Sequence, residues 1–392
     1  MTQKDAKTLD KLDKQAAKII QLFSGAGCEL IAPDILQPAD VFLDRSGENI
    51  RQRAYVFSDL DGAELCLRPD LTVPAARVYL RNNPQADQPA RYCYRGPAFR
   101  YQSAEKSGVN PREFEQMGVE FFGDSDCQAV EAEVLVLTIE ALKTVGLKDF
   151  SVHIGDLGLF AAIADKIDMP ARWRERMKHH FWRPGAFRDL LSSLSDGTYG
   201  DPDSNRMKVL DEISGAGAGD ITMAVSKVLD AKDIPLAGLR SLDEIAARLA
   251  EQAADRAQAP LDTEVVSAIG DYLLIDGPPR ESLEQVEAIA KRLGIDISAA
   301  QQAFTRRLDL AQERGVSLDK ARFSAEFGRN LEYYTGFVFQ LELPDSNASG
   351  QIAGGGRYDG LLTDIGAPKP VPAIGCAIHT ERLLAAVKAG DL

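Results

Sequence analysis

Two short runs in the last quarter of the chain contain side chains that could bind a small polar molecule. The run Gly328–Gly336 carries an arginine, a glutamate and two adjacent tyrosines, and the run Ala353–Gly360 carries three glycines followed by Arg-Tyr-Asp. A guanidinium can hold a carboxylate with two parallel hydrogen bonds, and a phenol can pair with a ring nitrogen. These groups describe a pocket for a small, polar, aromatic ligand, which is the chemistry of free histidine. We expect Gly354–Gly356 to form a tight turn against this ligand.

Further polar residues lie on two predicted strands that are joined by a polar loop. The first strand, residues 91–102, carries Arg100 near its end, and this residue alone is compatible with a solvated surface arginine. On the return strand Gln116, Gly118 and Glu120 share one face, because side chains alternate along a strand. We expect Gly118 to leave a floor on which a ligand rests. The two strands together favour a binding site over a plain surface.

The chemistry of free histidine sets what such a pocket must supply. The ligand has an ammonium group, a carboxylate and two ring nitrogens, and a buried site has to pair each of them because unpaired polar groups are costly. An acid against the ring N–H and a phenol against the other nitrogen would do so and would reject apolar analogues.

Composition excludes several classes of protein. The 392 residues are 45% hydrophobic and carry a formal net charge of −14, which opposes binding to nucleic acid because such proteins present a basic face to phosphates. No run is long enough to span a membrane, and no signal peptide is recognisable. The five cysteines are scattered and none forms a CxxC pair, so we expect reduced core residues, no metal site and a cytoplasmic location.

The elements that must position these residues indicate an α+β fold. An amphipathic helix is predicted at 6–24, and long helices at 127–145 and from about 380. The predicted strands are 28–33, 53–59, 63–68, 91–102, 113–122, 151–155, 322–327, 337–343 and 373–378. We expect an antiparallel sheet flanked by helices, built from residues 1–156 and 317–392, and split by a mainly helical insertion at 157–316.

With these motifs in place, the chain resembles the catalytic core of class II aminoacyl-tRNA synthetases, and histidyl-tRNA synthetases in particular. The resemblance covers about residues 6–156 and 319–385. Its motifs are motif one around Pro33, motif two ending in Arg100, motif three at Gly375–Arg382, the two runs described above, and the loop Leu67–Thr72.

The resemblance implies a set of ligand contacts. Asp70, Thr72 and Gln116 would hold the α-ammonium group, Glu120 and Tyr334 the ring nitrogens, and Arg329 the carboxylate. The full candidate histidine-binding set is Asp70, Thr72, Arg100, Gln116, Glu120, Arg329, Tyr333 and Tyr334.

Several positions depart from the synthetase pattern. Gln102 stands where motif two has a glutamate, so Arg100, Gln102 and Arg382 are expected to be a vestigial nucleotide site. Only residues 383–392 follow motif three, so we expect no anticodon-binding domain. The chain therefore resembles one paralogue group, the regulatory subunits of ATP phosphoribosyltransferase, which serve the first step of histidine biosynthesis.

That group implies a non-catalytic chain without a cofactor, whose partner is a short catalytic subunit and whose ligand is histidine. It would confer feedback inhibition and activation on that subunit, and it would bind neither nucleic acid nor membrane. A homodimer is implied through the motif-one segment, where Leu30, Ile31 and Pro33 are apolar. Two alternatives stay open, a histidine–tRNA ligase and a histidine-activating enzyme that loads a carrier protein. Both would show histidine-dependent exchange of pyrophosphate into ATP.

Overall fold

The computed structural model describes residues 4–43, 52–102, 111–181, 183–197, 222–223, 226–227, 241–327, 333–344 and 350–387. The chain forms two compact units. One combines Met1–Ile167 with Asp271–Leu392, and the other is Asp168–Gly270. The helical unit lies within the expected insertion at 157–316 but is shorter than it, because residues 157–167 and 271–316 belong to the first unit. The insertion itself stays a prediction.

A nine-stranded sheet forms the centre of the first unit, in the order β1-β5-β6-β12-β11-β10-β7-β9-β8. Its strands are β1 (Glu29–Ile31), β5 (Ala90–Phe99), β6 (Glu113–Phe122), β7 (Ser151–Asp156), β8 (Asp276–Gly277), β9 (Ala321–Ser324), β10 (Phe337–Glu342), β11 (Gln351–Arg357) and β12 (Ala373–His379). The predicted α+β class is confirmed. The sheet is mixed, because β1 pairs with β5 and β7 with β9 in parallel, while the other pairings are antiparallel.

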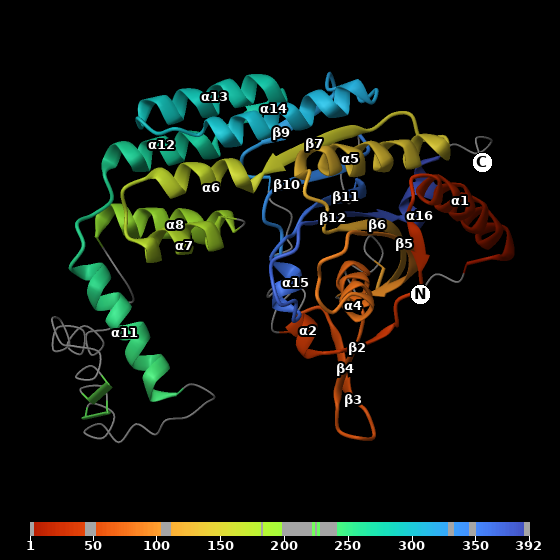
Figure 1. Ribbon diagram of the computed structural model, residues 1–392, viewed down its shortest axis with the longest axis horizontal. Coiled ribbons are helices and arrows are strands. Elements are labelled where there is room, and N and C mark those ends of the chain that lie inside the picture. Colours follow the sequence, from red (N-terminus) through yellow and green to blue (C-terminus); the bar gives the residue numbers. More distant parts are fainter. Residues whose placement is uncertain are drawn as a thin grey trace. The chain divides into compact units, whose positions relative to one another are not determined.

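Helices cover both faces of this sheet (Figure 1). One face carries α1 (Ala6–Gly25), α5 (Cys127–Thr144) and α14 (Ser298–Glu313), with α13 (Pro279–Arg292) beside α14. The opposite face carries α4 (Thr72–Asn82), which contacts α15 (Leu361–Asp364). The unit also contains α2 (Asp40–Leu43), α6 (Leu157–Lys166) and α16 (Thr380–Ala386).

The sequence explains why α1 and α5 form where they do. In α1 the Asp5 side chain caps the helix by accepting a hydrogen bond from the Thr8 N–H at 2.8 Å, and apolar residues recur at helical spacing on its buried face. In α5 Asp126 accepts from the Ala129 N–H at 3.3 Å. Most of α5 is buried because it packs between the sheet and α14.

A small sheet and the helical unit complete the described structure. The small sheet has the order β2-β4-β3, with β2 (Leu36–Pro38), β4 (Glu64–Leu67) and β3 (Tyr55–Ser58). The helical unit holds α7 (Ala171–His180), α8 (Pro184–Asp196) and α11 (Leu242–Arg256), and α12 (Thr263–Leu273) runs across its boundary. In this unit the Trp173 indole donates to the buried Asp255 carboxylate at 2.6 Å.

Two further properties concern the described residues. None of the helices among them is both long enough and apolar enough to cross a membrane. All five cysteines are free thiols, and four of them are buried.

The expectation of a tight turn at Gly354–Gly356 is wrong, because these glycines lie inside strand β11, in the middle of the sheet. Neighbouring strands approach Gly355 and Gly356 too closely for any side chain. A Cβ atom on Gly355 would overlap the carbonyl oxygen of Gly375 and lie 2.9 Å from the Cys376 Cα. On Gly356 it would lie 2.7 Å from the Phe337 carbonyl oxygen. Glycine is therefore required by close backbone approach within a strand.

Replacing Gly355 by alanine is expected to destabilise the fold by about 1–3 kcal/mol or more, since backbone atoms would have to move apart. Gly270→Ala is a matched control, because a Cβ atom there meets nothing within 4 Å and the residue lies in helix α12. That variant should be neutral or more stable by about 0.5–1 kcal/mol. Urea unfolding of both variants tests this, and equal stability of the two would contradict the packing described here.

Candidate functional site

The carboxylate of Glu120 lies at the centre of the candidate site. Glu120 is on β6 and is 0% exposed. It faces Gly375 across the β6–β12 pairing, and a Cβ atom on Gly375 would overlap the Glu120 carboxylate. The glycine of motif three therefore makes the space in which this acid is buried.

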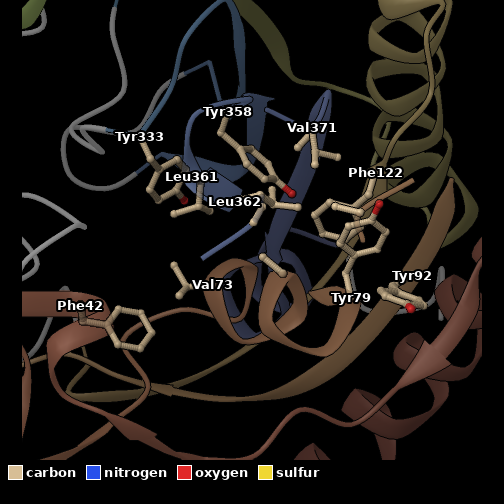
Figure 2. Packing of buried hydrophobic residues seen from close by; sticks show 14 of the residues in the cluster. Phe42, Val73, Tyr79, Tyr92, Phe122, Tyr333, Tyr358, Leu361, Leu362 and Val371 are labelled. Atoms are coloured by element: carbon tan, nitrogen blue, oxygen red, sulfur yellow. The ribbon is translucent and has the colours of Figure 1, made fainter. Parts of the chain in front are cut away.

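Two phenols hold this carboxylate from opposite sides. The Tyr94 hydroxyl, on β5, donates to Glu120 Oε1 at 2.9 Å. The Tyr358 hydroxyl, just after β11, donates to Glu120 Oε2. Tyr358 lies in an apolar cluster that includes Tyr333, Leu361 and Leu362 (Figure 2). This packing fixes the ring and hence the direction of the hydroxyl.

Burial changes the protonation of these groups. Burial raises the pKa of Glu120 to about 8, and the charge of Asp70 also raises it. Hydrogen bonds from the hydroxyls of Tyr358, Thr72 and Tyr94 oppose this rise. The pKa values of both tyrosines are raised well above their ordinary range, again mainly by burial. Burial therefore favours the protonated form of this acid, and a ligand that donates a hydrogen bond to it would favour the ionised form.

Two acceptor oxygens, one on Asp70 and one on Gln116, have no hydrogen-bond partner among the described residues. Asp70, buried before α4, accepts from the Val73 N–H with Oδ1 at 3.2 Å, while its Oδ2 is buried and unpaired. Gln116 lies on the same face of β6 as Glu120, and its Oε1 is also buried and unpaired. Burial raises the pKa of Asp70, an effect that the charge of Arg100 counters. Unpaired buried acceptors match a ligand with N–H donors, such as an ammonium group.

The tyrosine pair lies close to Tyr358. The Tyr333 ring is 5.7 Å from that of Tyr358 and 4.9 Å from that of Tyr334, measured between centroids. Tyr333 is buried in the apolar cluster, so it supports the position of Tyr358, and Tyr334 is half-buried against Gly356. Arg329, the expected carboxylate clamp, lies outside the described residues.

The expected vestigial nucleotide residues are Arg100, Gln102 and Arg382, and each makes a hydrogen bond to or from the backbone. Arg100 Nε donates to the Pro69 carbonyl at 2.7 Å, and Arg382 Nη1 donates to the Gln351 carbonyl at 3.0 Å. Burial lowers the pKa of Arg382, and the charge of Arg100 adds to this effect. The two guanidinium groups are thus close enough to repel each other. Gln102 is buried, and its carbonyl accepts from Arg112 at 3.0 Å.

Sequence reasoning missed Tyr94 and Tyr358 and misjudged Gly118. The space above Gly118 is filled, since a Cβ atom there would lie 2.7 Å from the Tyr94 hydroxyl. Gly118 therefore admits Tyr94 to Glu120 and does not form an open floor. Tyr94 pairs with Gly118 across the β5–β6 ladder, which places it diagonal to Glu120. This pairing is the feature that could have identified it. Tyr358 could have been identified from its position directly after the glycine-rich strand.

No group of His, Cys, Asp and Glu side chains within the described ranges is arranged to hold a metal ion. The hydroxyls of Tyr94, Tyr358 and Thr72 donate to Glu120, and the unpaired acceptors of Asp70 and Gln116 suit an organic ligand with N–H groups.

Comparison with known proteins gives consistent results. The family profile described as "Histidyl-tRNA synthetase" matches residues 3–265 and 207–383. A protein of Chelativorans sp. (strain BNC1) named "ATP phosphoribosyltransferase regulatory subunit" is 33% identical over 94% of this chain and 96% of its own length. A protein of the same name from Mesorhizobium japonicum is 32% identical over the same shares.

Solved structures show the same fold. A Bacillus halodurans structure titled as an ATP phosphoribosyltransferase regulatory subunit/histidyl-tRNA synthetase superimposes with a TM-score of 0.68 at 21% identity, covering 100% of this chain and 82% of that one. Histidyl-tRNA synthetase from Nostoc sp. PCC 7120 gives a TM-score of 0.61 at 17% identity, covering 97% and 72%. At these identities the likeness concerns the fold, and it confirms the predicted synthetase-like sheet.

Replacing Glu120 by glutamine should change how stability depends on pH. The folded pKa of about 8 exceeds the ordinary value of 4.5, so the folded state holds this proton more tightly than the unfolded chain. The resulting stabilisation, of the order of a few kcal/mol, is complete below pH 4.5 and is lost as the pH rises through about 8.

Melting temperatures between pH 5 and pH 9 test this expectation. The wild-type melting temperature should fall more steeply with pH than that of Glu120→Gln. The exposed Glu140→Gln should keep the wild-type slope. Parallel slopes for wild type and Glu120→Gln would mean that Glu120 ionises normally.

Proposed function

Since the chain belongs to the histidyl-tRNA synthetase family and, within it, to the ATP phosphoribosyltransferase regulatory subunits, we propose that it binds free histidine and makes a short catalytic subunit sensitive to it. The chain acts as a regulatory subunit and not as a catalyst. Its ligand, its feedback role and its homodimeric state are the parts that this proposal adds.

One observation carries the proposal. The acid Glu120 is buried and held by two phenols, and Asp70 and Gln116 each carry a buried acceptor oxygen that has no partner among the described residues. Asp70 is close enough to Glu120 for its charge to raise the pKa of that acid, and Gln116 lies on the same face of β6. An imidazole N–H would donate to Glu120, and an α-ammonium group would donate to Asp70 and Gln116. A ligand without these donors would leave the oxygens unpaired, at a cost of about 1–3 kcal/mol for each. This requirement selects histidine over apolar amino acids.

A regulatory effect follows if histidine prefers one state of the complex. A ligand shifts an equilibrium only by its differential affinity for the two states, and such coupling is typically about 1–3 kcal/mol. The proposed complex works in the cytoplasm, without nucleic acid, in keeping with the net charge of −14.

We also propose a homodimer built on the small sheet. Val56 and Phe57 are adjacent on edge strand β3, and each is about two-fifths exposed, so both faces of this strand are uncovered. Further exposed apolar side chains lie on β1, on β2 and around the β3–β4 turn, namely Leu30, Ile35, Leu36 and Leu60. A second copy that covers this apolar surface would supply the burial that the isolated chain lacks.

Mixing the chain with a short-form ATP phosphoribosyltransferase should make that enzyme inhibitable by histidine. Asp70→Asn removes the charge proposed to bind the ammonium group but keeps the oxygen that accepts from Val73, so the half-inhibiting histidine concentration should rise at least about tenfold. The exposed Asp364→Asn is the matched control and should behave as wild type. Equal inhibition with and without this chain would refute the regulatory proposal, and unchanged inhibition in Asp70→Asn would refute the site.

Replacing Phe57 by aspartate should weaken the dimer, because a charge would be buried in the apolar contact. Leu274→Asp is the control, since Leu274 is 79% exposed and lies away from the small sheet. Sedimentation equilibrium over a concentration series measures the association constant. A wild-type monomer at micromolar concentration, or the same constant for Phe57→Asp and wild type, would contradict this interface.

A further inference from the structure

A buried cluster of charged residues lies on the face of the sheet that α5 and α14 cover. Its centre is Glu131 on α5, whose side chain is 2% exposed. Glu131 Oε1 accepts from Arg357 Nε, and Glu131 Oε2 accepts from Arg307 Nε at 2.5 Å. One carboxylate therefore joins an arginine of β11 to an arginine of α14.

Arg307 connects α14 with the segment that enters β10. Its Nη1 donates to Asp156 Oδ2 at 2.7 Å, and its guanidinium lies 4.5 Å from the centroid of the Phe337 ring. Phe337 directly follows the run that holds the paired tyrosines. Arg307 thus contacts Glu131 and also Phe337, the residue directly after the run Gly328–Gly336.

Arg357 connects Glu131 with the two runs Gly328–Gly336 and Ala353–Gly360. Its Nη1 donates to Asp359 at 2.9 Å, and its alkyl chain packs on Gly336, where a Cβ atom would lie 3.3 Å from Arg357 Cδ. Its carbonyl accepts from the Thr335 N–H at 2.8 Å. The next residue is Tyr358, which donates to Glu120. Arg357 is therefore directly bonded along the chain to the residue whose hydroxyl holds the central acid.

We propose that Glu131, Arg307 and Arg357 form a positioning relay that couples helix α14 to the ligand pocket through Tyr358. The relay rests on the proposed histidine site for its purpose, although its geometry does not depend on a ligand. Arg307 and Glu131 are positioning residues, because they reach the pocket only through other side chains. In this proposal, histidine draws Glu120 toward itself and so moves Tyr358. The carboxylate of Glu131, which binds both arginines, then passes this movement to α14.

The charged nature of the cluster supports this role. Burying ions carries a desolvation cost, and apolar residues of similar size often stabilise a core as well or better. The shared carboxylate fixes the geometry, because each arginine binds one of its oxygens and also a second carboxylate. Such an arrangement links three elements whose contacts change together.

The first test uses the ligand-free chain and hydrogen–deuterium exchange. Arg307→Lys keeps the charge but cannot reproduce the forked contacts with Glu131 and Asp156. We expect faster exchange in α14 and also in residues 333–344 and 351–362, which are distant in sequence. Arg306→Met, on the same helix, removes an exposed ion pair with Asp126, so its effect should be confined to α14 and the start of α5 and should not reach residues 333–344 or 351–362. Exchange in Arg307→Lys that changes only within α14 would overturn the relay.

The second test measures histidine affinity by calorimetry across a pH series. Asp70, Thr72, Tyr94 and Tyr358 are the groups that face Glu120. Because the Tyr358 hydrogen bond lowers the pKa of Glu120, its loosening in Arg307→Lys should move the affinity profile to higher pH. Binding at neutral pH should weaken roughly three- to tenfold.

A double variant separates positioning from general destabilisation. If Arg307 acts through Tyr358, Arg307→Lys should have little further effect on affinity in a Tyr358→Phe background. Additive losses, or a profile that does not shift, would overturn the coupling to the pocket. A wild-type chain that binds no histidine would refute the proposed ligand, while the exchange experiment would still decide whether the relay exists.

Discussion

The burial of one carboxylate, that of Glu120, constrains most of this structure. A buried acid needs hydrogen-bond donors, and the fold supplies them from two apolar clusters through Tyr94 and Tyr358. It also needs space, which Gly375 and Gly118 provide on the neighbouring positions of the sheet. The result is an acid with a pKa of about 8 that responds to the presence of a donor. Such a group can report on a ligand without performing chemistry on it.

The rest of the sheet follows from this constraint. Strand β11 passes between β10 and β12, and Gly355 and Gly356 allow the neighbouring backbones to approach it closely. It then delivers Arg357 to Glu131 on one side of the sheet and Tyr358 to Glu120 on the other. The pocket and the buried charged cluster are thus built from adjacent residues. This adjacency is the physical basis for a link between ligand and helix packing.

Much of the fold could be predicted, because helix and strand periodicity is strong in segments such as α1 and β6. The motifs predict that Asp70, Gln116 and Glu120 belong to one site, and all three side chains are buried in the structure. Strand β11 could not be predicted, since glycines carry no side-chain pattern and their need arises from neighbours distant in sequence. Tyr94 was missed because a long loop joins β5 to β6, so their register cannot be read from loop length. The parallel pairing of β1 with β5 likewise depends on tertiary packing.

The central claim is that the Glu120 pocket holds free histidine. Isothermal titration calorimetry of wild type and Glu120→Gln, with histidine at pH 8, tests it most directly. The account predicts saturable binding of one histidine per chain to wild type, and binding at least about tenfold weaker in the variant, because the imidazole N–H loses a charged acceptor. Absence of binding to wild type, or the same affinity for both proteins, would contradict the account.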